Sequence, residues 1–429
     1  MKRRLLELVM IGAVSFSMAC GTSSTGKGDQ PPTETEIPTS RIELDPMLIQ
    51  VGASPEEART LNADDVFDDA FKAYQARRYE EAVHHYATLI KYFPESRFIL
   101  PSLFNSGLAY EKLGRWDEAS ASYKVILAQF PKKRDARDAY FRLANVLEQL
   151  EEHEAIVELM TQAMLRPDIT HFDRCEAHVR RSMALLELGS YDEAEEGFRT
   201  MLRLNKDSGV QQRLAENAHF VVQSHFGLGR ALHAQVMATP LVLPPEKMGE
   251  DLQAKAELFL SAQSAYIRAL RVHHPKWSVA SGYMIGRLYE DFYLSIFSAE
   301  IPDDLTEEQL VLYFDELRKQ LKPLMVRAIQ VYEKNLSLSR RIDVEYDHNT
   351  WREATDVHLE RLKAYLDDPF TQRRAERLVM QGRPLHELWN PRLMASDAVV
   401  DALERAVKAS TEGPAQGEAS TEDADTPES

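Results

Sequence analysis

The chain of 429 residues contains very little cysteine, with Cys20 and Cys175 as its two thiols. Two thiols cannot build a scaffold of several disulfides or a four-thiolate zinc site. Glycine and proline are also sparse, at 18 and 20 residues, which excludes a collagen-like or globally low-complexity chain. No internal run approaches the roughly 20 apolar residues that a membrane-spanning helix needs. The folded part of the chain must therefore be stabilised by an ordinary hydrophobic core.

Positive charge is in deficit, because 51 Lys and Arg face 68 Asp and Glu, for a net charge of −17. Non-specific nucleic-acid binding needs a basic face that displaces counterions. Nucleic acid is therefore not an expected partner. A composition of 44% apolar and 28% charged residues is ordinary for a folded protein, and the length allows two or three domains or one extended array.

Recognisable catalytic motifs are missing as well, since no HExxH, GxSxG, CxxC or strand-flanked GxGxxG occurs. His171, Cys175 and His178 have i, i+4, i+7 spacing and can share one helix face as a soft-metal trio. Nothing supplies a second shell for a metal, so we predict packed or solvated side chains, with Cys175 a buried small residue. The sequence predicts no catalytic residue, metal or cofactor, and we expect a non-enzymatic protein.

The N-terminus has the features of a secretory signal, because Lys2-Arg3-Arg4 precede a short apolar stretch over residues 5–19. Ser17-Met18-Ala19-Cys20 resembles the lipobox of bacterial lipoproteins. The resemblance implies a signal peptide over 1–19 and acylation of Cys20 with fatty acids such as palmitate. Because Gly21 follows the cysteine, it also implies anchorage at the outer membrane, facing the periplasm. The alternative is an ordinary secretory signal cut nearby, with Cys20 incidental.

Two further segments are predicted to lack a core. Residues 20–62 are expected to form the lipidated cysteine and a flexible tether, since 21–46 are small, polar and proline-rich. Residues 409–429 contain six carboxylates and no Lys or Arg, which predicts a disordered acidic tail. That tail is either simply solvated or docks onto a basic partner.

An internal repeat is the main informative feature of the sequence. ARRYEEAVHHYATLIKYFPES, LGRWDEASASYKVILAQFPKK and LGSYDEAEEGFRTMLRL each contain an aromatic residue, two acids, an alanine, and a second aromatic four residues later. Ala82, Ala119, Ala155 and Ala194 are separated by 37, 36 and 39 residues. A period in the mid-thirties with this pattern resembles the tetratricopeptide repeat, a helix–turn–helix unit. The resemblance implies four such repeats over residues 63–205.

In that family, small residues lie where two helices approach closely, aromatic residues fill the adjacent space, and a proline follows the second helix. The third copy keeps Ala155 and Pro167 but has Leu150 and Glu152 where glycine and an aromatic residue belong. The residues that match signature positions in the other copies are Ala70, Tyr79, Ala82, Tyr86, Pro94, Gly107, Tyr110, Gly114, Trp116, Ala119, Tyr123, Pro131, Gly189, Tyr191, Ala194 and Phe198.

Helical periodicity continues beyond residue 205, and it predicts divergent repeat-like helices over 206–366. The expected helices cover 210–237, 250–273, 277–298, 306–339 and 347–366. Three prolines interrupt residues 367–408, which we expect to form an irregular helical cap. The predicted fold class is all-α, a tetratricopeptide-repeat α-solenoid with divergent C-terminal helices.

The resemblance also implies a binding groove lined by the first helix of each repeat. Its aromatic side chains can accept an extended or helical peptide, although half or more of the candidates can instead be packing residues. The lysine and asparagine clamp that some such domains use for a C-terminal carboxylate is not matched. The candidate groove residues are Phe67, Phe71, Tyr74, Gln75, Phe104, Leu108, Glu111, Lys112, Tyr140 and Glu148.

A lipobox, a tether and a repeat array together resemble repeat lipoproteins of bacterial envelope complexes. Residues 65–170 are similar to the repeat lipoprotein of the outer-membrane barrel assembly machine, and 322–341 to that of myxobacterial gliding machinery. We therefore predict a non-enzymatic scaffold that binds other envelope proteins in barrel assembly, gliding motility or secretion. One alternative is an assembly chaperone or pilotin for a secretin or another outer-membrane protein. Another is a regulator or enzyme of cell-wall metabolism, with its site in 277–408.

Overall fold

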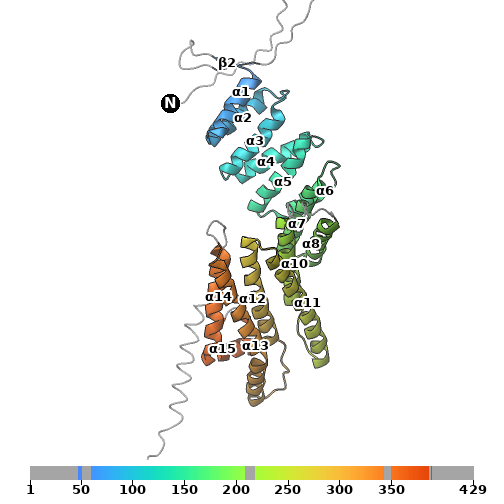
Figure 1. Cartoon of the computed structure of the whole chain (residues 1–429), viewed down its shortest axis with the longest axis vertical. Helices are drawn as coiled ribbons and strands as arrows, with labels where there is room; N and C mark the ends of the chain where they lie inside the picture. Colours follow the sequence, from blue (N-terminus) through green and yellow to red (C-terminus); the bar gives the residue numbers. More distant parts are fainter. Residues whose placement is uncertain (1–46, 51–58, 208–217, 343–348, 386–387, 389–429) are drawn as a thin grey trace, which may run out of the picture. The chain divides into compact units, whose positions relative to one another are not determined.

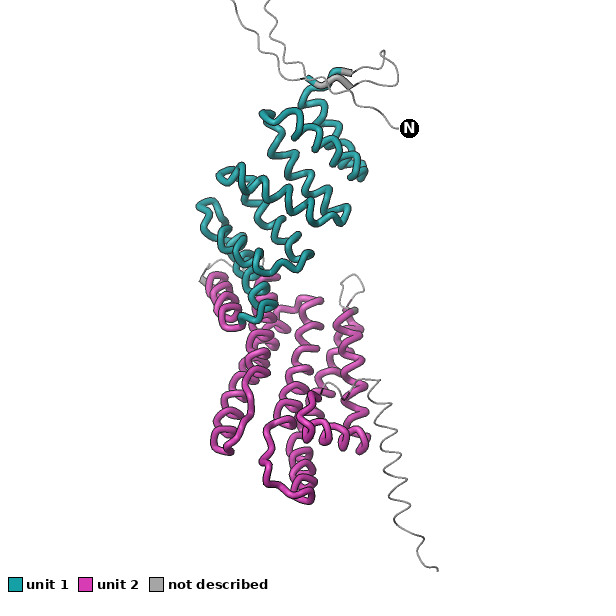
Figure 2. The backbone as a smooth tube through the Cα atoms, turned by 180° about the vertical axis from the view of Figure 1, so that it is seen from behind, with its two compact units in different colours: residues 1–190 teal, residues 191–429 magenta. Residues whose placement is uncertain are grey.

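The computed structural model describes residues 47–50, 59–207, 218–342, 349–385 and 388. The chain divides into two compact units, residues 1–190 and 191–429 (Figure 2). The predicted signal peptide, Cys20, residues 389–408 of the predicted cap and the acidic tail lie outside the described residues. Within the described ranges, no helix combines the length and the apolar character that crossing a membrane requires.

Unit 1 consists of helices that follow one another through short turns and pack against their neighbours in sequence (Figure 1). Its elements are β1 Leu48–Gln50, β2 Arg59–Leu61, α1 Ala63–Gln75, α2 Tyr79–Tyr92, α3 Ile99–Lys112, α4 Trp116–Gln129, α5 Arg134–Gln149, α6 His153–Met164 and α7 His171–Glu187. The pairs α1–α2, α3–α4 and α5–α6 are the predicted helix–turn–helix units, and the all-α class is confirmed.

The end of the predicted tether differs from the expectation, because β1 and β2 pair there as antiparallel strands with Leu48 opposite Leu61. Leu61 is buried in the hydrophobic cluster of unit 1. Burial of this side chain fixes the chain just before α1. The tether predicted over 20–62 therefore contains two short strands in its last part.

Local signals account for where the helices start. Asn62 and Asp65 form a reciprocal capping box at α1, and Thr170 and Asp173 form another at α7. Acidic residues occupy the first turns of α2 and α4, where the helix dipole favours negative charge. The aromatic residues Tyr79 and Trp116, which the repeat pattern singled out, are the first residues of α2 and α4.

The turns inside the helix pairs share one left-handed residue. Gly114 has φ 70° in the second pair, and Arg77 has φ 59° in the first. In the third pair this residue is Glu151, with φ 57°. Glycine adopts this conformation without steric cost, whereas other residues adopt it at some cost. Copies without glycine at the turn therefore carry a weaker sequence signal.

The alignment predicted for the third copy is wrong by one residue. His153, rather than Glu152, begins α6, and Ile156 three residues later is 1% exposed. Ala155, which was aligned with Ala119, is only partly buried. The spacing from Ala119 to Ile156 is 37 residues, equal to that between the first two copies. Because Ile156 takes the place of the small alanine of the other copies, the repeat pattern did not identify the correct alignment of the third copy.

The close approach of paired helices is confirmed at Gly107 of α3. A Cβ atom there would lie 2.6 Å from Cζ of Tyr123 in α4, so only glycine fits beside this ring. In the first pair, Ala70 takes the equivalent position and belongs to the same buried cluster as Tyr86. Both tyrosines are fully buried, as the repeat pattern predicted.

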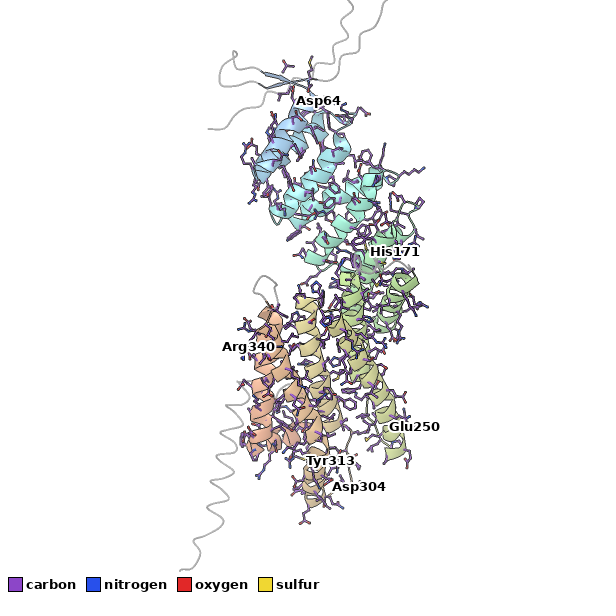
Figure 3. All side chains as sticks on the ribbon, in the orientation of Figure 1. Asp64, His171, Glu250, Asp304, Tyr313 and Arg340 are labelled. Carbon is purple, nitrogen blue, oxygen red and sulfur yellow. The ribbon has the colours of Figure 1, made fainter. Side chains whose placement is uncertain are left out.

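Unit 2 contains longer helices, and the predicted ones are found with small shifts at their ends (Figure 1). Its helices are α8 Tyr191–Asp207, α10 Ala218–Ala238, α11 Pro245–Arg271, α12 Pro275–Phe297, α13 Glu307–Ser339, α14 Asn349–Asp367 and α15 Pro369–Met380. The helix α11 starts five residues early because proline is favoured at the first helical position. The helix α10 begins at Ala218, and residues 210–217 of the helix predicted over 210–237 lie outside the described residues. Figure 3 marks Glu250 in α11 and Tyr313 in α13.

Contacts between glycine and tyrosine recur in this divergent region. A Cβ at Gly229 of α10 would lie 2.5 Å from the ring of Tyr266 in α11, and a Cβ at Gly286 of α12 would lie 2.2 Å from the ring of Tyr332 in α13. In the second repeat the glycine and tyrosine are 16 residues apart, but here they are 37 and 46 apart. The longer helices keep the contact between glycine and tyrosine but place the two residues farther apart in the sequence, so the repeat period is lost.

Candidate functional site

The first helices of the pairs in unit 1 present the candidate binding surface, which we call the A-helix face. It belongs to α1, α3, α5 and α7. Ion pairs connect α3 with α5 and α5 with α7, so these helices lie side by side. The A-helix face contains the predicted groove residues and two arginines, Arg142 and Arg180, that form ion pairs with them.

Three aromatic residues of the predicted groove pack within unit 1. Phe67, Phe104 and Tyr140 are all partly buried against its main hydrophobic cluster. The Phe67 ring stacks on Phe98 at a centroid distance of 4.6 Å, and Phe104 contacts the edge of the Tyr123 ring at 5.7 Å. Their principal contacts are with the protein itself, so the structure favours packing as their role.

The two predicted glutamates, Glu111 and Glu148, form a charged ladder across the A-helix face. Arg142 of α5 donates to Glu111 Oε2 of α3 at 3.3 Å, and Arg180 of α7 donates to Glu148 Oε1 of α5 at 2.6 Å. Arg142 and Arg180 are 38 residues apart, about one repeat period. Sequence reasoning missed both arginines, although their spacing was a usable signal.

Glu111 also connects the ladder to the core beneath it. The Tyr123 hydroxyl donates to Glu111 Oε1 at 2.6 Å, and Glu111 is 15% exposed. Burial together with this hydrogen bond to a carboxylate raises the pKa of Tyr123. The tyrosine therefore stays a neutral donor that fixes the carboxylate, and a rigid carboxylate in turn positions Arg142.

The remaining predicted groove residues are more accessible. Phe71 is 41% exposed and stacks loosely on Phe67 at 6.4 Å. Gln75 and Lys112 are exposed, whereas Leu108 and Tyr74 are partly buried. The Tyr74 ring meets Tyr79 edge-on at 5.5 Å. The accessible part of the A-helix face thus combines an exposed aromatic ring with ordered charges.

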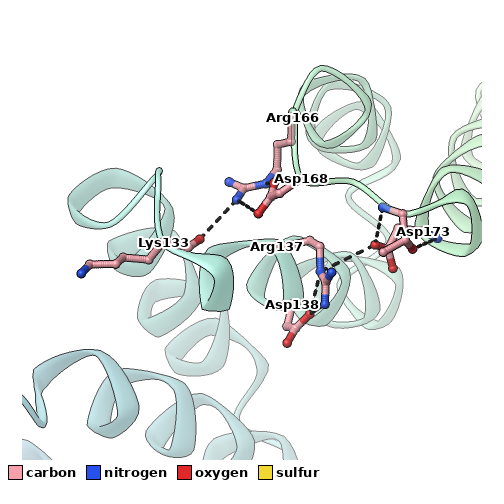
Figure 4. Close-up of polar contacts among 7 residues, drawn as sticks. Lys133, Arg137, Asp138, Arg166, Asp168 and Asp173 are labelled. Atoms are coloured by element: carbon pink, nitrogen blue, oxygen red, sulfur yellow. Dashed lines mark hydrogen bonds and ion pairs between the residues drawn. The ribbon is translucent and has the colours of Figure 1, made fainter.

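The turns between successive pairs are held by a second polar cluster (Figure 4). Arg166, after α6, donates to the carbonyl oxygens of Pro131 and Lys133 in the preceding turn at 2.6 and 3.2 Å. It also makes two bonds with the Asp168 carboxylate at 2.9 and 2.8 Å. Its side chain is only 9% exposed. Arg166 therefore clamps one inter-repeat turn onto the next and sets the spacing of the pairs.

A buried polar network in unit 2 was not anticipated from the sequence. Glu290 of α12 is 1% exposed. It accepts from the Tyr332 hydroxyl at 3.0 Å and lies 2.8 Å from Nδ1 of His358. Arg287 Nη2 donates to both carboxylate oxygens of Asp291, at 2.9 and 3.0 Å. The network joins α12, α13 and α14, and burial of its charges makes it sensitive to loss of any one partner.

Neither unit displays a recognisable metal centre among the described residues, because no group of three or more His, Cys, Asp or Glu could hold an ion there. In the proposed trio, Cys175 is fully buried and its Sγ lies 3.6 Å from His171 Nε2. Burial raises the pKa of the Cys175 thiol, which disfavours the thiolate that metals bind. The prediction that Cys175 is a packed side chain is confirmed.

Comparison with known proteins supports the repeat assignment at the second pair. Residues 102–133 match the family model of the tetratricopeptide repeat, and they lie within the four repeats predicted over 63–205. No curated protein sequence matches the chain significantly. The match covers α3, α4 and the following turn, which are the elements that contain Gly107, Gly114 and Tyr123.

Several solved structures are similar. A tetratricopeptide repeat protein from Parabacteroides merdae is 14% identical, with 68% of this chain and 97% of that chain covered and a TM-score of 0.34. The C-terminal part of a TPR repeat-containing protein from Cytophaga hutchinsonii is 11% identical, with 69% and 95% covered and a TM-score of 0.37. YrrB, described as a TPR protein with an unusual peptide-binding site, is 17% identical, with 49% and 92% covered and a TM-score of 0.32. At TM-scores below 0.5 these likenesses carry no argument about function.

Proposed function

We propose that the chain is a non-enzymatic scaffold whose A-helix face binds a partner protein. The observation that carries this proposal is the exposed Phe71 ring on a face whose charges, Glu111, Arg142, Glu148 and Arg180, are fixed by ion pairs between neighbouring helices. Aromatic and arginine side chains are enriched at protein interfaces, and preordered side chains lose little entropy on binding. Repeated helix pairs supply an extended surface of the size that a protein partner needs.

We further propose that a lipid on Cys20 holds this scaffold at the periplasmic face of the outer membrane, within an envelope complex for barrel assembly, gliding motility or secretion. The support is the lipobox-like sequence that ends at Cys20. Several acyl chains on one residue bind a bilayer stably, whereas a single chain binds only marginally. Partners on this proposal are other envelope proteins, and the membrane is contacted through the lipid.

The binding face is tested by placing a photo-crosslinking amino acid at Gln75 or Lys112 in cells, and at Lys124 on α4 as a control. All three positions are exposed, but Lys124 belongs to the second helix of its pair. We expect one reproducible set of envelope proteins to be captured from Gln75 and Lys112 and not from Lys124. Equal capture from all three positions, or none from the first two, contradicts binding at the A-helix face.

The role of Phe71 is tested by Phe71→Ala, with Leu165→Ala as the matched control. Leu165 is an exposed apolar residue, 81% accessible, directly after α6. Truncating an aromatic anchor at an interface typically costs about 2 kcal/mol or more. We expect Phe71→Ala to weaken partner recovery by about tenfold or more, with unchanged helical content, and Leu165→Ala to have no effect. A folded Phe71→Ala protein with normal recovery would contradict the proposal.

The anchor is tested separately with Cys20→Ser. We expect this variant to leave the membrane fraction in cells and to retain binding to the captured partner after purification. Continued membrane association of Cys20→Ser would contradict the lipid anchor while leaving the binding face intact.

A further inference from the structure

A small cavity lies among four helices of unit 2, with a volume of about 230 Å³. Sites for small molecules usually measure roughly 300–1,000 Å³. This cavity therefore suits a single chemical group better than a whole cofactor. The residues that line it are Tyr293 of α12, Arg318, Lys319 and Lys322 of α13, Tyr365 and Leu366 of α14, and Gln372 of α15.

The charge of the lining is one-sided, because it contains three cations and no carboxylate. Arg318 is held in place by ion pairs with Asp315 and Glu376, and its side chain is 22% exposed. These two acids do not line the cavity. The charged residues of this lining are thus opposite in sign to the net charge of −17 on the whole chain.

Two lysines at this cavity, Lys319 and Lys322, are accessible to an anionic ligand. Lys319 is 75% exposed, and its Nζ lies 3.5 Å from Glu316, an exposed contact of a kind that contributes little. Lys322 is exposed and makes no ion pair in the part of the chain that the structure describes. An ammonium on a flexible stem is a common ligand for phosphate oxygens.

The walls of the cavity are ordered. The Tyr293 and Tyr365 hydroxyls are 2.8 Å apart, and both residues are buried. The Gln372 side-chain amide donates to the carbonyl oxygens of Tyr365 and Leu366 at 2.9 and 3.1 Å, which fastens α15 to the end of α14. A site with fixed walls and hydroxyl groups loses little entropy when a polar ligand enters.

We propose that this cavity binds one oxyanion, a phosphate or carboxylate group, with Lys319 and Lys322 contacting its oxygens. The group can come from two sources. One is a phosphate-bearing ligand from solution. The other is a carboxylate of residues 409–429 of this chain, which contain six acids and no Lys or Arg.

The test uses inorganic phosphate and the full chain with Cys20→Ser, measured by equilibrium dialysis at constant ionic strength. We expect saturable binding at one site. Lys322→Ala should weaken the affinity about tenfold, the effect of losing one charge-assisted contact. Lys334→Ala is the matched control, because Lys334 is also exposed and lies three turns further along α13. Both lysines are exposed, so neither change should disturb folding.

A second variant distinguishes the sources by neutralising the tail within the full chain. Its substitutions are Glu412→Gln, Glu418→Gln, Glu422→Gln, Asp423→Asn, Asp425→Asn and Glu428→Gln. Tighter phosphate binding to this variant assigns the cavity to the tail carboxylates, and unchanged binding assigns it to an external oxyanion. The proposal is overturned if neither chain binds phosphate saturably, or if Lys322→Ala and Lys334→Ala reduce binding equally.

Discussion

The Gly107→Ala substitution gives the sharpest test of how the helix pairs of unit 1 are held together. The new Cβ would lie 2.6 Å from Cζ and 2.7 Å from Cε1 of Tyr123. Tyr123 cannot easily move aside, because it is fully buried and its hydroxyl donates to Glu111 at 2.6 Å. Either α3 must separate from α4 or the ring must leave its position.

Two opposing effects determine the size of the change. Alanine is better than glycine in a helix by about 1 kcal/mol, which favours the substitution. Overpacking of a filled core costs typically about 1–3 kcal/mol, and the fixed ring places this site at the upper end. We expect Gly107→Ala to destabilise the α3–α4 pair by about 2 kcal/mol. Gly249→Ala in α11 is the control, since nothing lies within 4 Å of its new Cβ and propensity alone should act.

Hydrogen exchange followed by mass spectrometry is the appropriate assay, because a chain with two compact units need not unfold in one transition. A loss of 2 kcal/mol corresponds to exchange about 30-fold faster in α3 and α4. Gly249→Ala should slow exchange in α11 slightly. A Tyr123→Leu background should remove most of the cost of Gly107→Ala, which a double-mutant cycle measures. Unchanged or slower exchange in α3 and α4 of Gly107→Ala would refute the reasoning.

Three further predictions concern electrostatics and the inter-repeat clamp. Burial lowers the pKa of His225 to about 4, so between pH 6.5 and 4 the unfolded chain binds a proton there that the folded chain does not. The contribution of neutral His225 to the free energy of unfolding is therefore present above pH 6.5 and is lost as the pH falls towards 4. The loss of stability between pH 7 and pH 5, measured by urea unfolding, should be smaller in His225→Gln. Glu290→Gln should lower the free energy of unfolding of unit 2 by about 3 kcal/mol in urea, because it breaks a buried polar network. The control Glu353→Gln, at an exposed position of α14, should leave the stability unchanged. Equal effects of the two substitutions would contradict this account. Arg166→Ala should accelerate hydrogen exchange about tenfold in the turn that contains Lys133, because two hydrogen bonds to carbonyl oxygens of that turn are lost. The control Arg134→Ala, at an exposed position, should leave this exchange unchanged. If the turn stays protected from exchange in Arg166→Ala, the clamp is not needed.

Much of unit 1 could be predicted from the sequence because its signals are local. The period of 37 residues between Ala82 and Ala119 identified the first two helix pairs, and both alanines are fully buried. Gly107 and Tyr123 were assigned a close contact from their positions in the repeat, and the structure confirms it. Helical periodicity located α10 to α14 even where the repeat had decayed.

The candidate site was less predictable, because the exposure of a side chain depends on helices far away in the sequence. Phe67 was assigned to the groove, yet it stacks on Phe98, which precedes the next helix pair. The third copy was misaligned because Ile156 replaces the small residue of the pattern, and only its burial reveals the register.

The helical class, the repeat register of two pairs and the positions of the small residues between them can all be predicted from the amino-acid sequence alone. These properties follow from local propensity and from spacing along the chain. The folded arrangement of the helices was needed to show that Glu111 pairs with Arg142, that Glu290 contacts Tyr332 and His358, and that three cations line one cavity. These arrangements bring together residues from different helices, and the sequence alone does not show which of its charged and polar side chains meet.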